Sequence, residues 1–487
     1  MKRYYILLLG LCMMTCIQAQ DNDPRKAFDR FAQRSKQRFD DFRSKANEQY
    51  AEAMKRAWDR FNALPAVPRP KDETVPPVVL PEKDRDKPIE TRPVPIKDVV
   101  TPPAPAPQPE PVAPIEEQPQ PKDQTVGFVY CGTKLEVRLD PKMRPRLSSC
   151  ENDALAAAWS QMAKEPTLNN TLRDCLALRQ DRQLCDWAYL NMIHALAKQA
   201  YGESNEATLL TAYLYCQSGY QMRLARNSER VVLLFASNHA IYNSGYYRLE
   251  NTNFYPFGGE EPLLEICEAK FPKEQPLSLL IPHVQQLDQQ PSAPRTLTSK
   301  RYANISVTTS VNKNMIDFYD NYPTSEVDDN FMTRWAMYGN TPLDDRVKAE
   351  LYPALRAKIQ GDDELKAANK LLNWVQTAFE YEYDEVVWGH DRAFFAEETL
   401  YYPYCDCEDR AILYTRLVRD LLGLKTVLVY YPGHLACAVC FNSEVAGDYL
   451  LLDGKRFVVT DPTYIGASVG MTMPGMDNSQ ASAILLK

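Results

Sequence analysis

The sequence is poor in histidine and glycine, with five His and 18 Gly among 487 residues. It contains neither a glycine-rich phosphate-binding loop nor a His-Glu-x-x-His motif, so nothing calls for a nucleotide cofactor or a catalytic metal. The net charge of -8 provides no basic face for nucleic acid. Beyond the N-terminus, no apolar run is long enough to cross a bilayer. We therefore expect no cofactor, no metal, no nucleic-acid partner and no transmembrane segment.

Residues 1–20 have the pattern of a secretory signal peptide. Lys2 and Arg3 precede the apolar run that begins at Ile6, and a cleavage site marked by small residues is expected near Ala19. This pattern predicts an exported protein, located in the periplasm, in the cell envelope or outside the cell.

Removing that segment leaves ten of the 12 cysteines, in a compartment that permits disulfide bonds. An even count does not fix the pairing. We expect at most a few bridges, among Cys131, Cys150, Cys175, Cys185, Cys216 and Cys267.

Residues 21–62 carry a periodic aromatic repeat. Phe28, Phe39, Tyr50 and Phe61 recur at every eleventh position. Because this period corresponds to about 3.67 residues per helical turn, the aromatic side chains line one face of a helix. The segment is predicted to be an amphipathic helix that packs on its own protein or self-associates, or that docks on a membrane surface or an envelope partner.

The next segments are distinguished by their composition. Residues 63–124 are dense in proline and predict a disordered linker. Helical and strand patterns then predict an α+β domain over 125–270, a β-rich connector over 271–344 and a C-terminal domain over 345–487. When the sequence is aligned with itself so that Gly219 matches Gly423, Glu203 matches Cys407. Residues 125–270 therefore have features of a degenerate copy of the C-terminal fold.

The most informative stretch is Tyr404-Cys-Asp-Cys-Glu-Asp-Arg410, which leads into an apolar-periodic helix that Gly423 ends. Asp406 has the position of an N-cap, which places Cys407 in the first turn. Backbone N-H groups and the helix dipole at that position are expected to lower the pKa of a thiol to roughly 3.5 to 7.5. Cys407 is therefore a candidate nucleophile that alkylating reagents should label near pH 6, ahead of Cys405.

Two strand ends downstream carry a base and a carboxylate. His434 begins the strand that follows the Pro432-Gly433 turn, and Asp461 closes the strand that follows the Asp453-Gly454 turn. A cysteine, a histidine and an aspartate on these elements form the set of groups that nucleophilic catalysis requires.

The order and spacing of these residues resemble the transglutaminase-like superfamily of papain-like cysteine enzymes. The resemblance rests on Asp-Cys-Glu-Asp opening a helix, Gly-His on a strand and Asp-Pro-Thr closing the next. It implies an α+β fold, with Cys407 as nucleophile, His434 as base and Asp461 as the group that orients the base. It also implies a thioester acyl-enzyme that acts on a peptide, protein or peptidoglycan-peptide substrate, releasing the acyl group to water or to an amine.

Two alternatives remain open. Cys405, Cys407, Cys437 and Cys440 could form a zinc site, although Cys437 and Cys440 should lie on opposite faces of their strand. A catalytically silent binding module of the cell envelope would keep the same fold.

The oxyanion donor is not assigned; Tyr404 and the Cys407 N-H are the candidates. The aromatic loop 381–404 is expected to wall the substrate groove.

Overall fold

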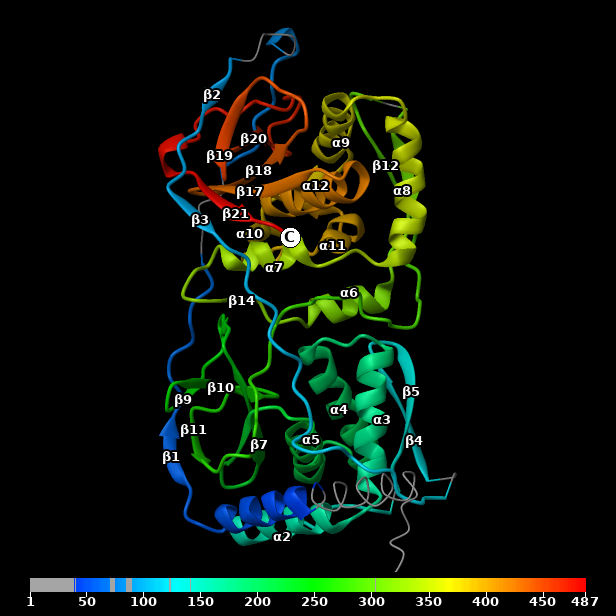
Figure 1. The fold of residues 1–487 in the computed structure, drawn as a ribbon, viewed down its shortest axis with the longest axis vertical. Coiled ribbons are helices and arrows are strands. Elements are labelled where there is room, and N and C mark those ends of the chain that lie inside the picture. Colours follow the sequence, from blue (N-terminus) through cyan, green and yellow to red (C-terminus); the bar gives the residue numbers. More distant parts are fainter. Residues whose placement is uncertain are drawn as a thin grey trace, which may run out of the picture.

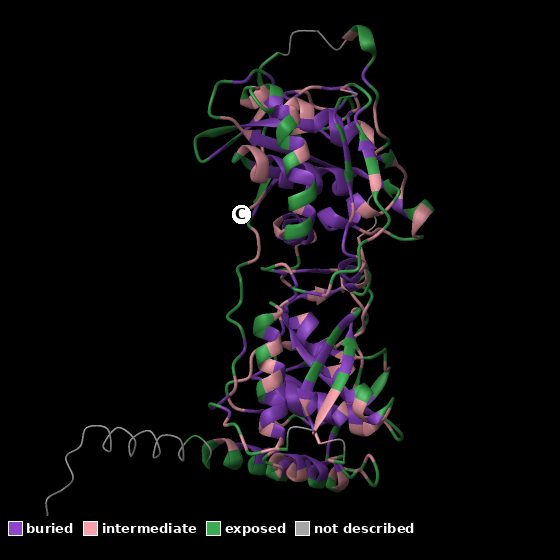
Figure 2. Ribbon diagram, turned by 90° about the vertical axis from the view of Figure 1, so that its right-hand side faces the viewer, coloured by how far each residue is buried: buried purple, intermediate pink, exposed green. Residues whose placement is uncertain are grey.

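The computed structural model describes residues 39–487 apart from 40, 71–74, 85–89, 122–123, 141 and 303. The predicted signal peptide and the start of the aromatic repeat lie outside these residues. The fold is mixed α+β, as predicted, and forms two lobes stacked along the long axis (Figure 1). Each lobe has a buried core (Figure 2).

The first lobe is built on an antiparallel sheet with the order β1-β11-β6-β7-β10-β9. Its strands are β1(Asp59–Asn62), β6(Met222–Arg226), β7(Val231–Ser237), β9(Tyr247–Leu249), β10(Thr252–Phe257) and β11(Leu263–Ile266). Its helices are α2(Asn152–Lys164), α3(Leu168–Asp181), α4(Asp186–Tyr201) and α5(Asn205–Gln217). The hairpin β4(Thr125–Tyr130) and β5(Thr133–Arg138) packs on α3 and α4.

The second lobe is built on a sheet with the order β2-β19-β20-β18-β17-β21-β3. Its strands are β2(Arg92–Pro93), β3(Asp98–Val100), β17(Lys425–Tyr431), β18(His434–Cys440), β19(Asp448–Leu452), β20(Lys455–Thr460) and β21(Ser482–Leu485). The long helix α12(Cys407–Leu422) packs against β17 and β18. Around it stand α7(Thr333–Asn340), α8(Asp345–Ile359), α9(Glu364–Ala378), α10(Asp384–Val387) and α11(Ala396–Tyr401).

The two lobes repeat one topology. In each, a helix leads into five strands whose spatial order matches: β11-β6-β7-β10-β9 in the first lobe and β21-β17-β18-β20-β19 in the second. The strands β6, β7 and β10 begin at 222, 231 and 252, and their counterparts β17, β18 and β20 begin at 425, 434 and 455, with the same offset each time. This offset is one residue shorter than the shift that aligns Glu203 with Cys407, so that alignment is wrong. The structural offset aligns Ser204 with Cys407, Val231 with His434 and Gly258 with Asp461, so the first lobe has none of the three candidate residues at these positions.

The N-terminal helix ends earlier than its repeat predicts. Helical residues run to Met54, whose carbonyl accepts a hydrogen bond of 2.8 Å from Trp58 Nε1, and Phe61 lies in strand β1 opposite Leu264. Tyr50 is buried against Trp159, with 4.8 Å between the ring centroids. The described part of this helix therefore packs on its own protein.

The proline-rich segment is not the free linker predicted from its composition. It supplies β2 and β3, which pair in parallel with β19 and β21 at the two edges of the second sheet. Val94 and Val100 are buried there. On its return to the first lobe the segment touches Gly219, where a Cβ would lie only 2.0 Å from the Glu110 carbonyl oxygen, so this position requires glycine. Because proline lacks an N-H, the segment offers more hydrogen-bond acceptors than donors. Arginine side chains bind some of these carbonyls, since Arg179 donates to Pro109 and Arg173 donates to Ile115.

The connector 271–344 is less β-rich than predicted. It holds two short antiparallel pairings, β12(Arg295–Thr298) with β13(Ser306–Thr309) and β14(Ser325–Glu326) with β8(Ala240–Ile241). It also holds the helices α6(Lys313–Asp320) and α7.

The ten described cysteines, from Cys131 to Cys440, are all free, so the expected bridges do not form. None of the described helices is long and apolar enough to span a membrane.

Candidate functional site

Cys407 is the first residue of α12, as the sequence predicts. Asp409 fixes the start of this helix, because its Oδ2 accepts a hydrogen bond from the Asp406 N-H at 3.1 Å while its Oδ1 accepts one from the Phe394 N-H at 2.8 Å. Both carboxylate oxygens are satisfied by backbone donors, and the carboxylate is buried. The helix start is thereby tied to the segment that precedes α11.

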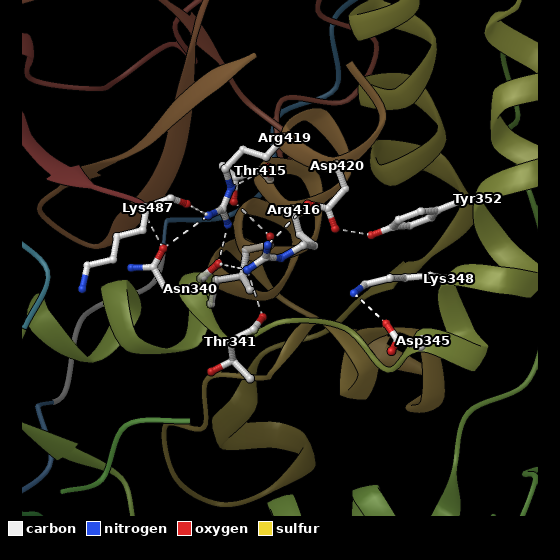
Figure 3. Close-up of polar contacts among 12 residues, drawn as sticks. Asn340, Thr341, Asp345, Lys348, Tyr352, Thr415, Arg416, Arg419, Asp420 and Lys487 are labelled. Atoms are coloured by element: carbon white, nitrogen blue, oxygen red, sulfur yellow. Dashed lines mark hydrogen bonds and ion pairs between the residues drawn. The ribbon is translucent and has the colours of Figure 1, made fainter. Parts of the chain in front are cut away.

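Two arginines hold the other end of α12 (Figure 3). Arg416 donates to the carbonyls of Gly339 and Thr341 at 2.9 and 3.0 Å. Arg419 donates to a Lys487 oxygen at 2.6 Å and to Asn340 Oδ1 at 3.3 Å. These bonds join α12 to the end of α7 and to the last residue of the chain, so the orientation of the helix is fixed at both ends.

His434 and Asp461 are brought together by sheet pairing. β18 begins at His434 and pairs with β20, which ends one residue before Asp461. His434 Nε2 lies 2.8 Å from Asp461 Oδ2. Asp461 Oδ1 accepts backbone N-H groups of Thr463 and Tyr464, so the carboxylate is oriented before it meets the ring.

His434 lines the same pocket as Cys407, but no hydrogen bond joins the two side chains. His434 Nδ1 is buried and has no hydrogen-bond partner within the described part of the chain. Cys407, His434 and Leu435 line one pocket. The structure therefore brings all three predicted residues into one region, with Asp461 behind the histidine.

The electrostatic environment of Cys407 differs from the prediction. Cys407 is only 3% exposed, and its Sγ lies 3.1 Å from Glu408 Oε2. Burial, together with the carboxylates of Glu408 and Asp406, raises the pKa of the thiol well above its ordinary value. The predicted low pKa is wrong, because the thiol is buried and because the adjacent carboxylates disfavour a second negative charge more than the helix dipole favours it.

Loop 381–404 contributes acidic rather than aromatic side chains to the wall of the pocket. The cavity holds about 40 Å³, and loop 381–404 contributes three carboxylates to it. Burial and Glu408 raise the pKa of one of these, Asp384, to about 8. Another, Asp391, pairs with the buried Arg334 at 2.6 Å. The aromatic side chains of the loop, among them Trp388 and Tyr402, instead pack around Arg392. The sequence did not predict these acidic side chains in the pocket wall, because residues in a loop follow no periodic pattern.

Arg334 and Trp335, at the start of α7, complete the lining. Both are buried, and Arg334 Nε and Trp335 Nε1 have no hydrogen-bond partner among the residues that the structure describes. Donors of this kind can stabilise an oxyanion. Tyr404, by contrast, is 40% exposed and is not part of the lining. Sequence reasoning missed Arg334 and Trp335 because they lie far upstream of the motif.

The cysteines do not gather as a zinc site requires. Cys437 Sγ donates to the Thr460 carbonyl at 3.0 Å and packs in the core with α12, whereas Cys440 packs on the other face of the sheet. Within the described ranges, the side-chain groups close enough to share an ion are acidic, with Cys407 as their only cysteine. They are Asp406-Cys407-Glu408, Asp384-Asp406-Asp409 and Asp384-Asp391-Glu408.

Comparison of the chain with family models, with curated proteins and with solved structures gave no match. The function is therefore argued from the geometry of the site.

Proposed function

We propose that the second lobe is a transglutaminase-like cysteine enzyme that acts on amide bonds through a thioester acyl-enzyme. The observation that carries this proposal is the His434–Asp461 pair, because the other ring nitrogen of His434 has no described partner and His434 lines the pocket that contains Cys407. An imidazole held at one nitrogen by a carboxylate, with its other nitrogen free and a thiol in the same pocket, provides the groups that a nucleophile and its base require.

The reaction begins when His434 Nδ1 takes the proton of Cys407 and the sulfur attacks the amide carbonyl. Asp461 stabilises the imidazolium that forms. The buried donors Trp335 Nε1 and Arg334 Nε, with the Cys407 N-H, are available to the oxyanion. His434 then protonates the leaving amine as the carbon-nitrogen bond breaks, which leaves the acyl group on sulfur. Water or an amine, deprotonated by His434, releases the acyl group and restores the thiol.

Burial and the adjacent carboxylates keep Cys407 a neutral thiol in the resting state. Since the pKa of Cys407 is raised by burial and by the adjacent carboxylates, the proton leaves sulfur only when His434 accepts it during attack. The enzyme thus differs from cysteine enzymes that store a thiolate-imidazolium pair.

Export and an envelope substrate belong to the same proposal. The signal-like pattern of residues 1–20 supports secretion, and hydrolysis of a peptide, a protein or a peptidoglycan peptide is the favoured outcome.

A second candidate is a catalytically silent binding module of the cell envelope. The observation that favours it is the burial of the triad, because Cys407, His434 and Asp461 are each 2 to 3% exposed. Such a module would keep the fold and bind peptides without cleaving them.

One experiment separates the two candidates. Purified protein is incubated with a complex peptide mixture and a primary amine, and the products are identified by mass spectrometry. The enzyme should create new peptide ends or amine-linked peptides, and Cys407→Ala should abolish them while Cys405→Ala retains them. Equal product in wild type and Cys407→Ala would reject the enzyme, and binding without any product would favour the module.

A further inference from the structure

The proline-rich segment passes beside the triad on its way to the second sheet. The Val75 N-H donates to the Gly433 carbonyl at 3.0 Å, and Gly433 precedes His434 and lines the catalytic pocket. Further along, the Leu80 N-H donates to the Ile465 carbonyl at 2.9 Å. Residues 75–80, here called the strap, therefore bind by backbone hydrogen bonds to the residue before His434 and to Ile465, four residues after Asp461.

The strap is bound as an extended peptide. Val79 pairs with Ile465 in a short parallel bridge, in which the Ile465 N-H also donates to the Val78 carbonyl at 2.8 Å. Leu80 is buried in a small apolar cluster with Tyr464, Ala467 and Met473, whereas Val79 is 60% exposed. Main-chain hydrogen bonds with a pocket for alternate side chains are the mode by which proteins bind extended peptide segments.

A second anchor lies upstream and contacts both lobes. The Arg69 guanidinium donates to the Asp391 carbonyl and to Thr324 Oγ1, and the Val67 carbonyl accepts the Asn243 N-H at 2.8 Å. Asp391, like Gly433, lines the pocket that contains Cys407. The same stretch of chain is thus fixed to two parts of the pocket rim, and the triad is almost fully buried.

We propose that the groove along Gly433 and Ile465 is the binding site for an extended polypeptide substrate, and that the chain's own strap fills it and keeps the enzyme closed. The ligand class is a polypeptide in extended conformation with an apolar side chain at the position of Leu80. This inference rests on the proposed function for its catalytic meaning, but the groove and its occupant are tested without catalysis.

The test releases the strap and measures access to Cys407. Val75→Pro removes the N-H that Gly433 binds, and Leu80→Ser weakens the apolar anchor. Val79→Pro is the matched control, because this residue is exposed and its N-H makes no hydrogen bond to a described residue. The rate of Cys407 modification by N-ethylmaleimide should rise at least about tenfold in the double variant, since a hydrogen bond and an apolar contact are both lost. The control should react at the wild-type rate.

A second arm tests the groove itself. A fluorescent peptide with the sequence of residues 75–81 should bind the double variant, and a Cys407→Ser version of it, but not the wild type, whose groove is filled. Unchanged maleimide reactivity, or equal peptide binding by wild type and variant, would overturn the proposal. If the double variant does not fold, Val75→Pro alone is measured in the same way. If the double variant binds the peptide but the protein cleaves no amide bond, the proposal of a peptide-binding groove stands and the proposal of an enzyme is rejected.

Discussion

Cys407 Sγ lies 3.1 Å from Oε2 of Glu408, so the thiol and the adjacent carboxylate share a hydrogen bond inside the pocket. Together with burial, this contact raises the pKa of Cys407. In the proposed reaction Cys407 therefore begins as a thiol, and its reactivity depends on His434 and on the charge at position 408.

The first prediction concerns the pH dependence of alkylation. Because iodoacetamide reacts with the thiolate, Cys407 should be labelled more slowly than glutathione at pH 7 and should accelerate only at higher pH. Glu408→Gln removes one of the charges that raise the pKa, so labelling at pH 7 should become at least a few-fold faster. Mass spectrometry of the alkylated peptide gives the rates, with Glu444→Gln as control because Glu444 is exposed and, among the described residues, pairs only with Arg456. Fast labelling of wild type at pH 6 would contradict this account.

The second prediction tests the orienting carboxylate. Asp461→Asn keeps an oxygen to accept the Thr463 N-H but no longer stabilises an imidazolium. By analogy with triads of this kind, turnover should fall by about 10²- to 10⁴-fold. The unfolding temperature should stay within a few degrees of wild type, and rates near those of wild type would show that Asp461 does not act on His434.

The third prediction tests the edge strand β3. Val100 is 3% exposed and its neighbour Val99 is 44% exposed, so the pair offers a matched comparison. Val100→Ser should lower the free energy of unfolding by about 1 to 3 kcal/mol, because it buries a hydroxyl and loses apolar contacts. Val99→Ser should change it by less than about 0.5 kcal/mol. Urea titration measures both, and equal effects would mean that β3 is not part of the folded sheet.

The fourth prediction concerns stability against pH. Burial raises the pKa of Glu397 to about 8, above its value in an unfolded chain, so the folded state binds the extra proton between about pH 4 and 8. Stability should therefore fall as pH rises through this window, and the loss is complete above pH 8. Glu397→Gln keeps an oxygen for the Asp344 N-H and should flatten this dependence. Urea titrations at pH 5 and pH 8 test it, and an unchanged slope in the variant would refute the assignment.

Local signals predicted the core of the second lobe well. The helix at Cys407 and the strand at Asp448–Leu452 were recoverable because a capping residue, a helical apolar period and an Asp-Gly turn all act over short stretches of chain. The edge strands β2 and β3 were not, since they are short and lie in a proline-rich context that has no period of its own. Their pairing depends on partners near the other end of the sequence.

The triad and its electrostatics were predictable to different degrees. Cys407, His434 and Asp461 lie at the ends of a helix and two strands. The order of these elements along the chain indicates that their ends, and so the three side chains, lie close together in the fold. The raised pKa of Cys407 was not predicted, because the helix dipole alone favours a thiolate and the opposing effect of Glu408 depends on burial. Asp384, Arg334 and Trp335 come from a loop and from another helix, and only tertiary packing places them beside the thiol.

The most direct measurement of the central claim is the reaction with p-nitrophenyl acetate. An acyl-enzyme predicts a burst of p-nitrophenolate close to one equivalent per active protein, and one acetyl group on the peptide that contains Cys407. The burst should be absent in Cys407→Ala, at least about 10²-fold slower in His434→Ala, and unchanged in Cys405→Ala. A protein that shows no acetylated Cys407, or that acetylates it equally fast without His434, would contradict the account.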